Sequence, residues 1–249
     1  MATLTAHCLL KNEENFIGYA IKSVIDFVDY VLVFDTGSTD KTVEIIQGLA
    51  QEHPGKIIFE EKGACDFERH THLRQEMIER TKTDWFMILD GDEVWPRRAI
   101  KEAKEAIGKG VYDGIKTHFY ECVGDIYHKH YKESYITLRF VKVGDVYSSG
   151  NFIQDNFYTK TGEEFLKKKN IYLLRNRYWH LTHLERSSLD NYDYSSGGTR
   201  IKKRRLTYFL IGRKINENAP EVFEESKNKL ALSKVNSLIN FVSMIRGKN

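Results

Sequence analysis

Two acidic positions in the sequence follow apolar runs that have the length of a β-strand. Asp35 ends the run YVLVFD, and Asp90 and Asp92 follow the run DWFMIL with one glycine between them. Two carboxylates so close together provide the oxygen ligands that Mg²⁺ or Mn²⁺ prefers, and such a metal also binds substrate phosphates. A carboxylate at a strand end can also accept hydrogen bonds from a ribose or a base. The two positions therefore predict a nucleotide site with a divalent metal, although helix capping at Asp35 and a solvated acidic turn at Asp90 stay open.

The surroundings of Asp35 distinguish two interpretations of the tetrapeptide DTGS at residues 35–38. Aspartic proteases carry such a tetrapeptide at a catalytic carboxylate, but in an all-β fold. Here apolar runs of strand length alternate with segments of helical spacing. The expected strands are 4–10, 29–35, 56–61 and 84–90, and the expected helices are 14–28, 40–53 and 71–83. This alternation indicates a parallel sheet with helices on its faces, in which ligands bind beyond the carboxyl ends of the strands.

The pattern changes after residue 93. We expect a helix over 96–110, strands over 114–123, 135–143 and 170–184, and a long C-terminal helix over 221–246. The intervening polar and basic stretches are 144–162 and 195–206. The predicted organisation is one domain over 1–185, with a nucleotide half over 1–95 and an acceptor half over 96–185, followed by a flexible basic stretch and helices over 186–249.

Composition restricts the class of protein. The formal net charge of +3 is too small to indicate nucleic-acid binding, and the three cysteines form neither a disulfide framework nor a Cys-x-x-Cys pair. With no signal peptide and no apolar run long enough to span a bilayer, a cytoplasmic location is expected. The basic segment 199–206 is interpreted as a solvated helix face, a loop over a diphosphate, or a peripheral contact with the inner face of the membrane. The apolar stripe of the last helix is compatible with a homodimer.

Four motifs occur in a specific order and spacing, and they are KNEEN, FDTGSTD, DFERHTHLRQ and ILDGDE. Over residues 3–100 this set resembles the family 2-type glycosyltransferases of the GT-A fold. The resemblance implies an α/β fold with a Rossmann-like mixed sheet and helices on both faces, followed here by a C-terminal helical segment. It also implies a nucleotide-diphosphate sugar as the donor, with a UDP-sugar favoured, and Mn²⁺ or Mg²⁺ as the cofactor.

The resemblance assigns donor contacts to six residues, which are Asn12, Glu13, Asp35, Asp66, Arg74 and Asp90. Asp90 and Asp92 resemble the Asp-x-Asp motif of the family, in which the last carboxylate binds the metal and the first reaches the ribose. We expect both carboxylates at the metal site.

A transfer of this type requires a base that takes the proton of the acceptor hydroxyl. Relatives often carry a glycine-rich turn followed by His-Glu, but the corresponding stretch 146–158 contains no His-Glu. Asp155 is the nearest carboxylate and is our candidate base, with Glu121 and Glu93 as rivals.

Histidines of the second half are candidates to complete the metal site. His180 and His183 are three residues apart and cannot share one strand face, so at most one of them is expected to bind metal. The pairs His70/His72 and His128/His130 have His-x-His spacing, but no third ligand accompanies either pair, which argues little for zinc.

The sequence therefore predicts a metal-dependent, inverting glycosyltransferase that acts on a glycan, lipid-linked or peptide acceptor, in synthesis of bacterial-type surface glycans or glycoconjugates. Two alternatives stay open. The missing His-Glu is compatible with a non-catalytic nucleotide-sugar binding module. The run ILDGDEV also fits a phosphotransferase of the haloacid dehalogenase type, in which Asp90 would be a covalent nucleophile, but that motif normally opens its domain, and here three β-α units precede it.

Overall fold

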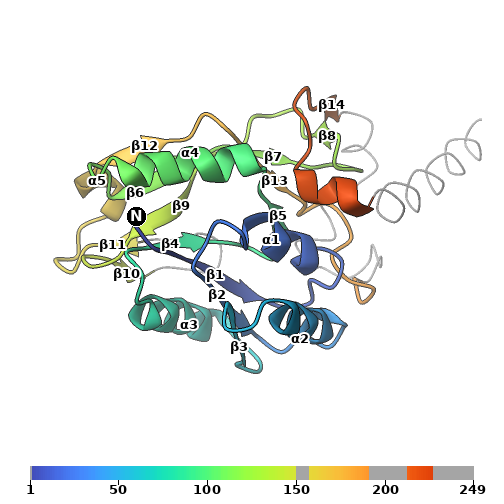
Figure 1. Cartoon of the computed structure of the whole chain (residues 1–249), viewed down its shortest axis with the longest axis horizontal. Helices are drawn as coiled ribbons and strands as arrows, with labels where there is room; N and C mark the ends of the chain where they lie inside the picture. The colour runs from blue at the N-terminus through green and yellow to red at the C-terminus, as the bar shows by residue number, and fades with distance from the viewer. Residues whose placement is uncertain (1, 150–156, 191–211, 227–249) are drawn as a thin grey trace, which may run out of the picture.

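A seven-stranded mixed sheet forms the centre of the protein in the computed structural model, which describes residues 2–149, 157–190 and 212–226 (Figure 1). The strand order is β12-β6-β9-β4-β1-β2-β3. The four parallel strands of the first half are β1 (Leu4–Leu10), β2 (Tyr30–Asp35), β3 (Ile57–Glu61) and β4 (Trp85–Ile88). All of them lie where the sequence predicts a strand, because continuous apolar runs are typical of strands buried on both faces.

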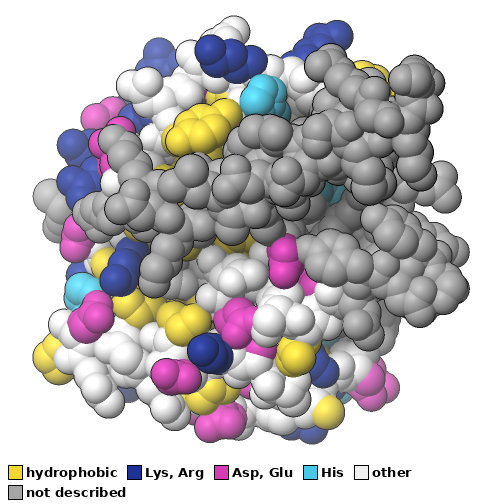
Figure 2. All heavy atoms as spheres, turned by 90° about the vertical axis from the view of Figure 1, so that its right-hand side faces the viewer, with side chains coloured by type: hydrophobic (Ala, Val, Ile, Leu, Met, Phe, Trp, Pro, Cys, Tyr) yellow, Lys and Arg dark blue, Asp and Glu magenta, His cyan; other side chains and the backbone are white. Residues whose placement is uncertain are grey.

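Helices cover both faces of this sheet, as expected. They are α1 (Ile17–Val24), α2 (Thr42–Glu52), α3 (Phe67–Arg80) and α4 (Arg97–Gly108). One face of β1 and β2 forms a core with apolar side chains of α1, α2 and α4. On the opposite face Leu32 and Phe34 pack against Leu73 and Met77 of α3. The carboxyl ends of β1 and β2 point to the right in Figure 1, toward the side that Figure 2 shows.

The second half extends the sheet through an antiparallel strand. β9 (Thr137–Lys142) pairs with β4 on one side and with β6 (Gly114–Thr117) on the other, and β12 (Ile171–Leu173) forms the edge. A short hairpin of β10 (Tyr147–Ser148) and β11 (Phe157–Tyr158) and the helix α5 (Phe165–Lys168) complete this region. The contact between α3 and β10 joins the two halves.

Two single strands expected from the sequence, 114–123 and 170–184, are each split between two sheets. Their second parts are β7 (Phe119–Glu121) and β13 (Tyr178–His180), which form a small sheet with β5 (Glu93–Val94) in the order β5-β13-β7. The expectation of continuous strands was wrong because residue 118 interrupts the first strand and hydrogen bonds fix a bend at residues 175–176 of the second. The carboxylate of Glu102 on α4 accepts bonds from the backbone N–H groups of Arg175 and Asn176, and Thr117 Oγ1 donates to the Asn176 carbonyl.

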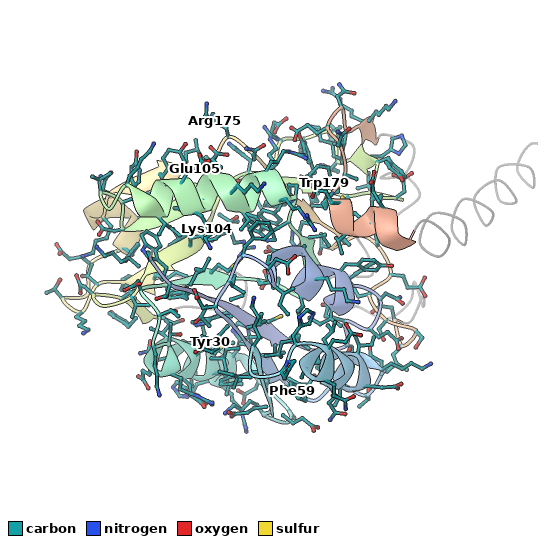
Figure 3. The ribbon with its side chains drawn as sticks, viewed as in Figure 1. Tyr30, Phe59, Lys104, Glu105, Arg175 and Trp179 are labelled. Atoms are coloured by element: carbon teal, nitrogen blue, oxygen red, sulfur yellow. The ribbon has the colours of Figure 1, made fainter. Side chains whose placement is uncertain are left out.

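A second apolar core lies under the small sheet and includes the segment 212–226. This segment contains β14 (Arg213–Lys214), which pairs with β8 (His128–Lys129), and a 3₁₀ helix (Glu221–Ser226). Ile215 and Phe223 are buried there together with Trp179, which lies beside the start of α4 in Figure 3. Of the expected helix 221–246 only the first six residues are described, as a 3₁₀ helix, while the rest and the basic segment 199–206 lie outside the described residues.

No helix among the described residues is long and apolar enough to cross a membrane.

Phe223→Ala tests whether the segment 212–226 belongs to the folded domain. Removal of this buried ring should lower the free energy of unfolding by about 3 kcal/mol, because it leaves a cavity beside Trp179 and Tyr19. Denaturant unfolding measures the change, and Glu224→Ala on the exposed side of the same helix is the control. Equal stability of both variants and the wild type would show that the segment does not contribute to the core.

Candidate active site

The carboxylate of Asp35 is held at the end of β2 by the turn that follows it. Its Oδ2 accepts hydrogen bonds of 2.9 Å from the N–H groups of Gly37 and Ser38, and Gly37 has a φ of 87°, which favours glycine. Its Oδ1 is buried and has no hydrogen-bond partner among the described residues. Buried polar oxygens are normally satisfied, so this oxygen is a candidate acceptor for a donor ligand. Asp35 therefore shapes its own turn with one oxygen, and its other oxygen has no hydrogen-bond partner among the described residues.

Asn12 joins this turn to the loop after β1. Its N–H donates to Ser38 Oγ at 2.8 Å, and its side-chain Oδ1 accepts from the Thr39 N–H at 2.9 Å. Asn12 has a φ of 53°, in the left-handed region that asparagine tolerates better than most residues. The residue predicted at the nucleotide edge thus holds two site loops together.

Glu13 is buried against the turn between the two aspartates of the Asp-x-Asp sequence. A Cβ atom on Gly91 would lie 2.7 Å from Glu13 Cγ, so only glycine fits at this position. The Glu13 carboxylate accepts a hydrogen bond of 2.7 Å from Nη1 of Arg186. The sequence did not indicate Arg186, which is 173 positions after Glu13 in the chain.

Asp90 lies between two buried guanidinium groups. Arg74 of α3 has Nη2 3.8 Å from Asp90 Oδ1, and Arg139 of β9 donates from Nη2 to Asp90 Oδ2 at 3.2 Å. The same nitrogen of Arg139 donates to Oε1 of Glu93. Arg74 and Asp90, which were both predicted as donor contacts, lie together, whereas Arg139 was not predicted. The one available signal for it was an arginine between the apolar residues Leu138 and Phe140 of β9.

Glu93 is an unsuitable base in this geometry. Its side chain is fully buried and its Oε1 is bonded to Arg139. Burial raises the pKa of Glu93 to about 8, while the charge of Arg139 acts in the opposite direction. A carboxyl group without solvent exposure cannot meet an acceptor hydroxyl without rearrangement.

Asp92 and His180 form the second part of the acidic turn. His180 Nε2 lies 3.3 Å from Asp92 Oδ1, and the Leu181 N–H donates to the Asp92 carbonyl at 2.8 Å. Burial by itself lowers the pKa of His180, but the charge and hydrogen bond of Asp92 outweigh it and raise the pKa to about 9. A carboxylate and an imidazole side by side are suitable metal ligands once the ring is neutral.

No group of three or more His, Cys, Asp or Glu side chains in the described ranges is arranged to hold a metal by itself. Asp92 and His180 would therefore need oxygens from a substrate diphosphate or water to complete a coordination sphere, as is usual for Mg²⁺. His128, of one His-x-His pair, has its Nδ1 2.9 Å from Oδ1 of Asp125. Among the described residues, neither His-x-His pair belongs to a group of three or more potential metal ligands, so the structure adds nothing to the weak indication of zinc.

Glu121 lies beside His180 in the small sheet and is bonded to the other candidate histidine. The pairing of β5, β13 and β7 aligns Glu93, His180 and Glu121 across that sheet. His183 Nε2 lies 2.8 Å from Glu121 Oε1, and this hydrogen bond lowers the pKa of Glu121. His180 is thus the histidine placed next to Asp92, and the predicted metal role of His183 stays a prediction.

Asp66, a further predicted residue, lies apart from this cluster. Asp66 is exposed and caps α3, because its Oδ1 accepts the Arg69 N–H at 2.9 Å. The loop before it is close to the site, since a Cβ on Gly37 would lie 3.3 Å from the Ala64 nitrogen. Asp155, the first candidate base, lies outside the described residues. Figure 2 shows several Asp and Glu side chains in the middle and lower part of this side of the molecule.

A family model described as glycosyl transferase family 2 matches residues 9–192. The chain belongs to glycosyltransferase family 2. The matched range includes every described residue of the site from Asn12 to Arg186. The family expected from the four motifs is confirmed, and the phosphotransferase alternative receives no support.

Relatives of this glycosyltransferase are similar over part of their length. The SPbeta prophage-derived glycosyltransferase SunS of Bacillus subtilis (strain 168) is 32% identical over 107 residues, which are 43% of this chain and 23% of that protein. A TPR repeat-containing protein of Synechococcus elongatus is 31% identical over 93 residues, 37% of this chain and 21% of that protein. The chain thus spans less than a quarter of the length of these curated relatives.

Solved structures confirm the GT-A fold expected from the sequence. S. aureus TarS 1-349 has a TM-score of 0.50 at 13% identity, covering 72% of this chain and 60% of that chain. Its complex with UDP-GlcNAc has a TM-score of 0.50 at 15% identity, covering 71% and 58%. At such identity the similarity concerns the fold alone.

Gly91→Ala tests the packing of Glu13 on the acidic turn. The added methyl group should displace Glu13 or the turn, since the stem of Glu13 is held in place by Arg186. We expect a lower melting temperature and weaker nucleotide binding. Gly48→Ala is the matched control, because nothing lies within 4 Å of its Cβ position inside α2, and it should stabilise the protein by about 0.5–1 kcal/mol. If Gly91→Ala and Gly48→Ala have the same melting temperature and the same affinity for UDP, the close packing of Glu13 on Gly91 is contradicted.

Proposed function

We propose that the protein transfers a glycosyl group from a nucleotide-diphosphate sugar to an acceptor hydroxyl. The observation that carries the proposal is the position of Asp92 beside His180 at the end of β4, on the same edge of the sheet as the buried Asp35 carboxylate. This arrangement supplies a metal-binding pair for the diphosphate and an acceptor for the nucleoside. A UDP-sugar is our favoured donor, and the TarS complex with UDP-GlcNAc is consistent with this choice.

In the proposed reaction the acceptor oxygen attacks the anomeric carbon while the bond from that carbon to the diphosphate oxygen breaks. A single displacement of this type inverts the anomeric configuration. A protein base takes the proton of the attacking hydroxyl. Asp92 and His180 would hold Mn²⁺ or Mg²⁺, which when bound neutralises negative charge on the leaving diphosphate. Asp35 would bind the nucleoside, and Asp90 would contact the ribose.

The acceptor and the cellular setting are proposed from the sequence. We propose a glycan, lipid-linked or peptide acceptor in synthesis of surface glycans or glycoconjugates, and a cytoplasmic location. Contact of the basic segment 199–206 with a membrane, and a homodimer, stay predictions because the segments concerned lie outside the described residues.

Asp92→Asn tests the donor site. With the wild type, one nucleoside diphosphate of a panel should raise the melting temperature in the presence of Mn²⁺, because a ligand at a hundred times its Kd stabilises the native state by about 2.7 kcal/mol. Asp92→Asn should abolish the Mn²⁺-dependent part of this shift. Asp26→Asn at an exposed position is the control and should behave as the wild type. A wild type that responds to no nucleoside diphosphate would refute the proposed function.

A comparison of Asp155→Asn with Glu121→Gln tests the identity of the base. We expect Asp155→Asn to lower kcat of transfer by about 10²–10⁴-fold with unchanged UDP binding. Glu121→Gln should retain more activity, because its hydrogen bond to His183 lowers the pKa of Glu121 and makes it a poor proton acceptor. The opposite order of the two kcat values would assign the base to Glu121.

A further inference from the structure

Arg139 is a buried cation in the acceptor half whose contacts are in the donor site. It lies on β9 next to Phe140 and Val141, both without solvent exposure. Its Nη2 donates to Asp90 and to Glu93, and its Nε donates to Tyr178 Oη at 3.1 Å. A residue of the second half therefore binds the first carboxylate of the Asp-x-Asp turn directly.

The arrangement around Arg139 is rigid. The Tyr178 ring is fully buried and is stacked on Trp95 with ring centroids 4.5 Å apart. Glu93 belongs to β5, whose pairing with β13 fixes its backbone. A guanidinium whose partners are fixed in this way has one orientation, and Arg139 presents the same Nη2 to both carboxylates.

Stability alone does not account for an ion pair at this position. Burial of an ionisable pair costs free energy, and replacement of such a pair by neutral groups of similar volume is often neutral or stabilising. The contact between Arg139 and Glu93 is therefore weak evidence for a role in stability alone. Their partner Asp90 remains about a third exposed at its side chain, so it is the member of the group that a ligand can reach.

The two aspartates of the turn are held by cations of different chemistry. Asp90 lies between the guanidinium groups of Arg74 and Arg139, which do not lose their protons in proteins. Asp92 lies beside the imidazole of His180, which can become neutral and bind metal. Arg139 therefore contacts Asp90, whereas Asp92 and His180 are the pair that could bind a metal.

We propose that Arg139 is a positioning residue that orients the Asp90 carboxylate toward the nucleoside part of the donor, and that Glu93 holds Arg139 in place for this purpose. The proposal rests on the proposed function and adds to it a residue of the acceptor half that determines donor affinity. A charged hydrogen bond contributes enough to binding that loss of the oriented Asp90 should weaken UDP binding by about tenfold or more.

The double variant Arg139→Met/Glu93→Gln separates positioning from folding. Arg139→Met alone leaves Glu93 buried without its partner and is expected to be unstable, whereas the double variant removes both charges and should melt near the wild-type temperature. Glu93→Gln alone is the second single variant, and because Glu93 holds Arg139 in place it should also weaken UDP binding. The measured quantities are the melting temperature, the Kd of UDP with and without Mn²⁺, and KM and kcat for a UDP-sugar.

We expect the double variant to be folded, to bind UDP about tenfold or more weakly, and to show a raised KM for the donor. The ratio of its UDP affinities with and without Mn²⁺ should stay as in the wild type, because Asp92 and His180 are intact. In Asp92→Asn, Mn²⁺ should no longer change the affinity for UDP. Arg139→Lys should be intermediate, since an ammonium group cannot reproduce the planar geometry of the guanidinium.

If the folded double variant binds UDP as tightly as the wild type, Arg139 only stabilises the fold and the proposal is overturned. If the double variant does not fold, wild-type UDP affinity in folded Arg139→Lys would overturn it equally. A wild type that binds no nucleoside diphosphate with Mn²⁺ refutes the proposed function itself, and with it this inference. Wild-type binding combined with unaffected variants refutes the inference alone.

Discussion

Burial of an acidic turn is the constraint on which the rest of this structure depends. Asp90, Asp92 and Glu93 lie within the five residues that follow β4, and Asp92 and Glu93 are buried. Ionised carboxylates removed from water are costly unless cations or hydrogen-bond donors compensate them. The compensating groups come from three separate elements, since Arg74 lies on α3, Arg139 on β9 and His180 on β13. The small sheet and the antiparallel strand bring these cations to one strand end.

The same charges determine which chemistry each carboxylate can perform. A carboxylate between guanidinium groups keeps its counter-charges at any physiological pH. An imidazole beside a carboxylate can lose its proton, and the neutral ring and the carboxylate can then bind a metal ion together. Asp90 and Asp92 look equivalent in the sequence, yet the structure gives them different partners. Glu13 contributes differently again, because its aliphatic stem fills the space above Gly91 and its carboxylate is bound to Arg186.

The parts of the site that could be predicted are those that depend on local sequence. Asp35, Asp90 and Asp92 were found because each follows an apolar run, and strand ends in a β-α series lie on one edge of the sheet. The helices on both faces followed from the same periodicity. His180 was a candidate, but only the register of β13 between β5 and β7 distinguishes it from His183.

The parts that could not be predicted depend on contacts between distant segments. Arg139 is one arginine in an apolar strand, and nothing near it in the sequence names Asp90 or Glu93 as its partners. Arg186 stands 173 positions from Glu13, with which it pairs. The division of the expected strand 170–184 between two sheets depends on Glu102, a helix residue whose carboxylate holds the bend at residues 175–176. Such pairings are tertiary, and periodicity does not report them.

The position of β13 in the middle of the small sheet has a consequence for biosynthesis. Chains are made from the N-terminus, and early segments can fold as soon as they leave the ribosome. The strands β1 to β4 can pair early, but Asp92 and Glu13 then stand without His180 and Arg186, which are translated some ninety or more residues after the acidic turn. The acidic turn of a nascent chain is therefore exposed to water until this late segment is inserted between β5 and β7. The insertion of β13 and the first moment of ligand competence should then be the same event.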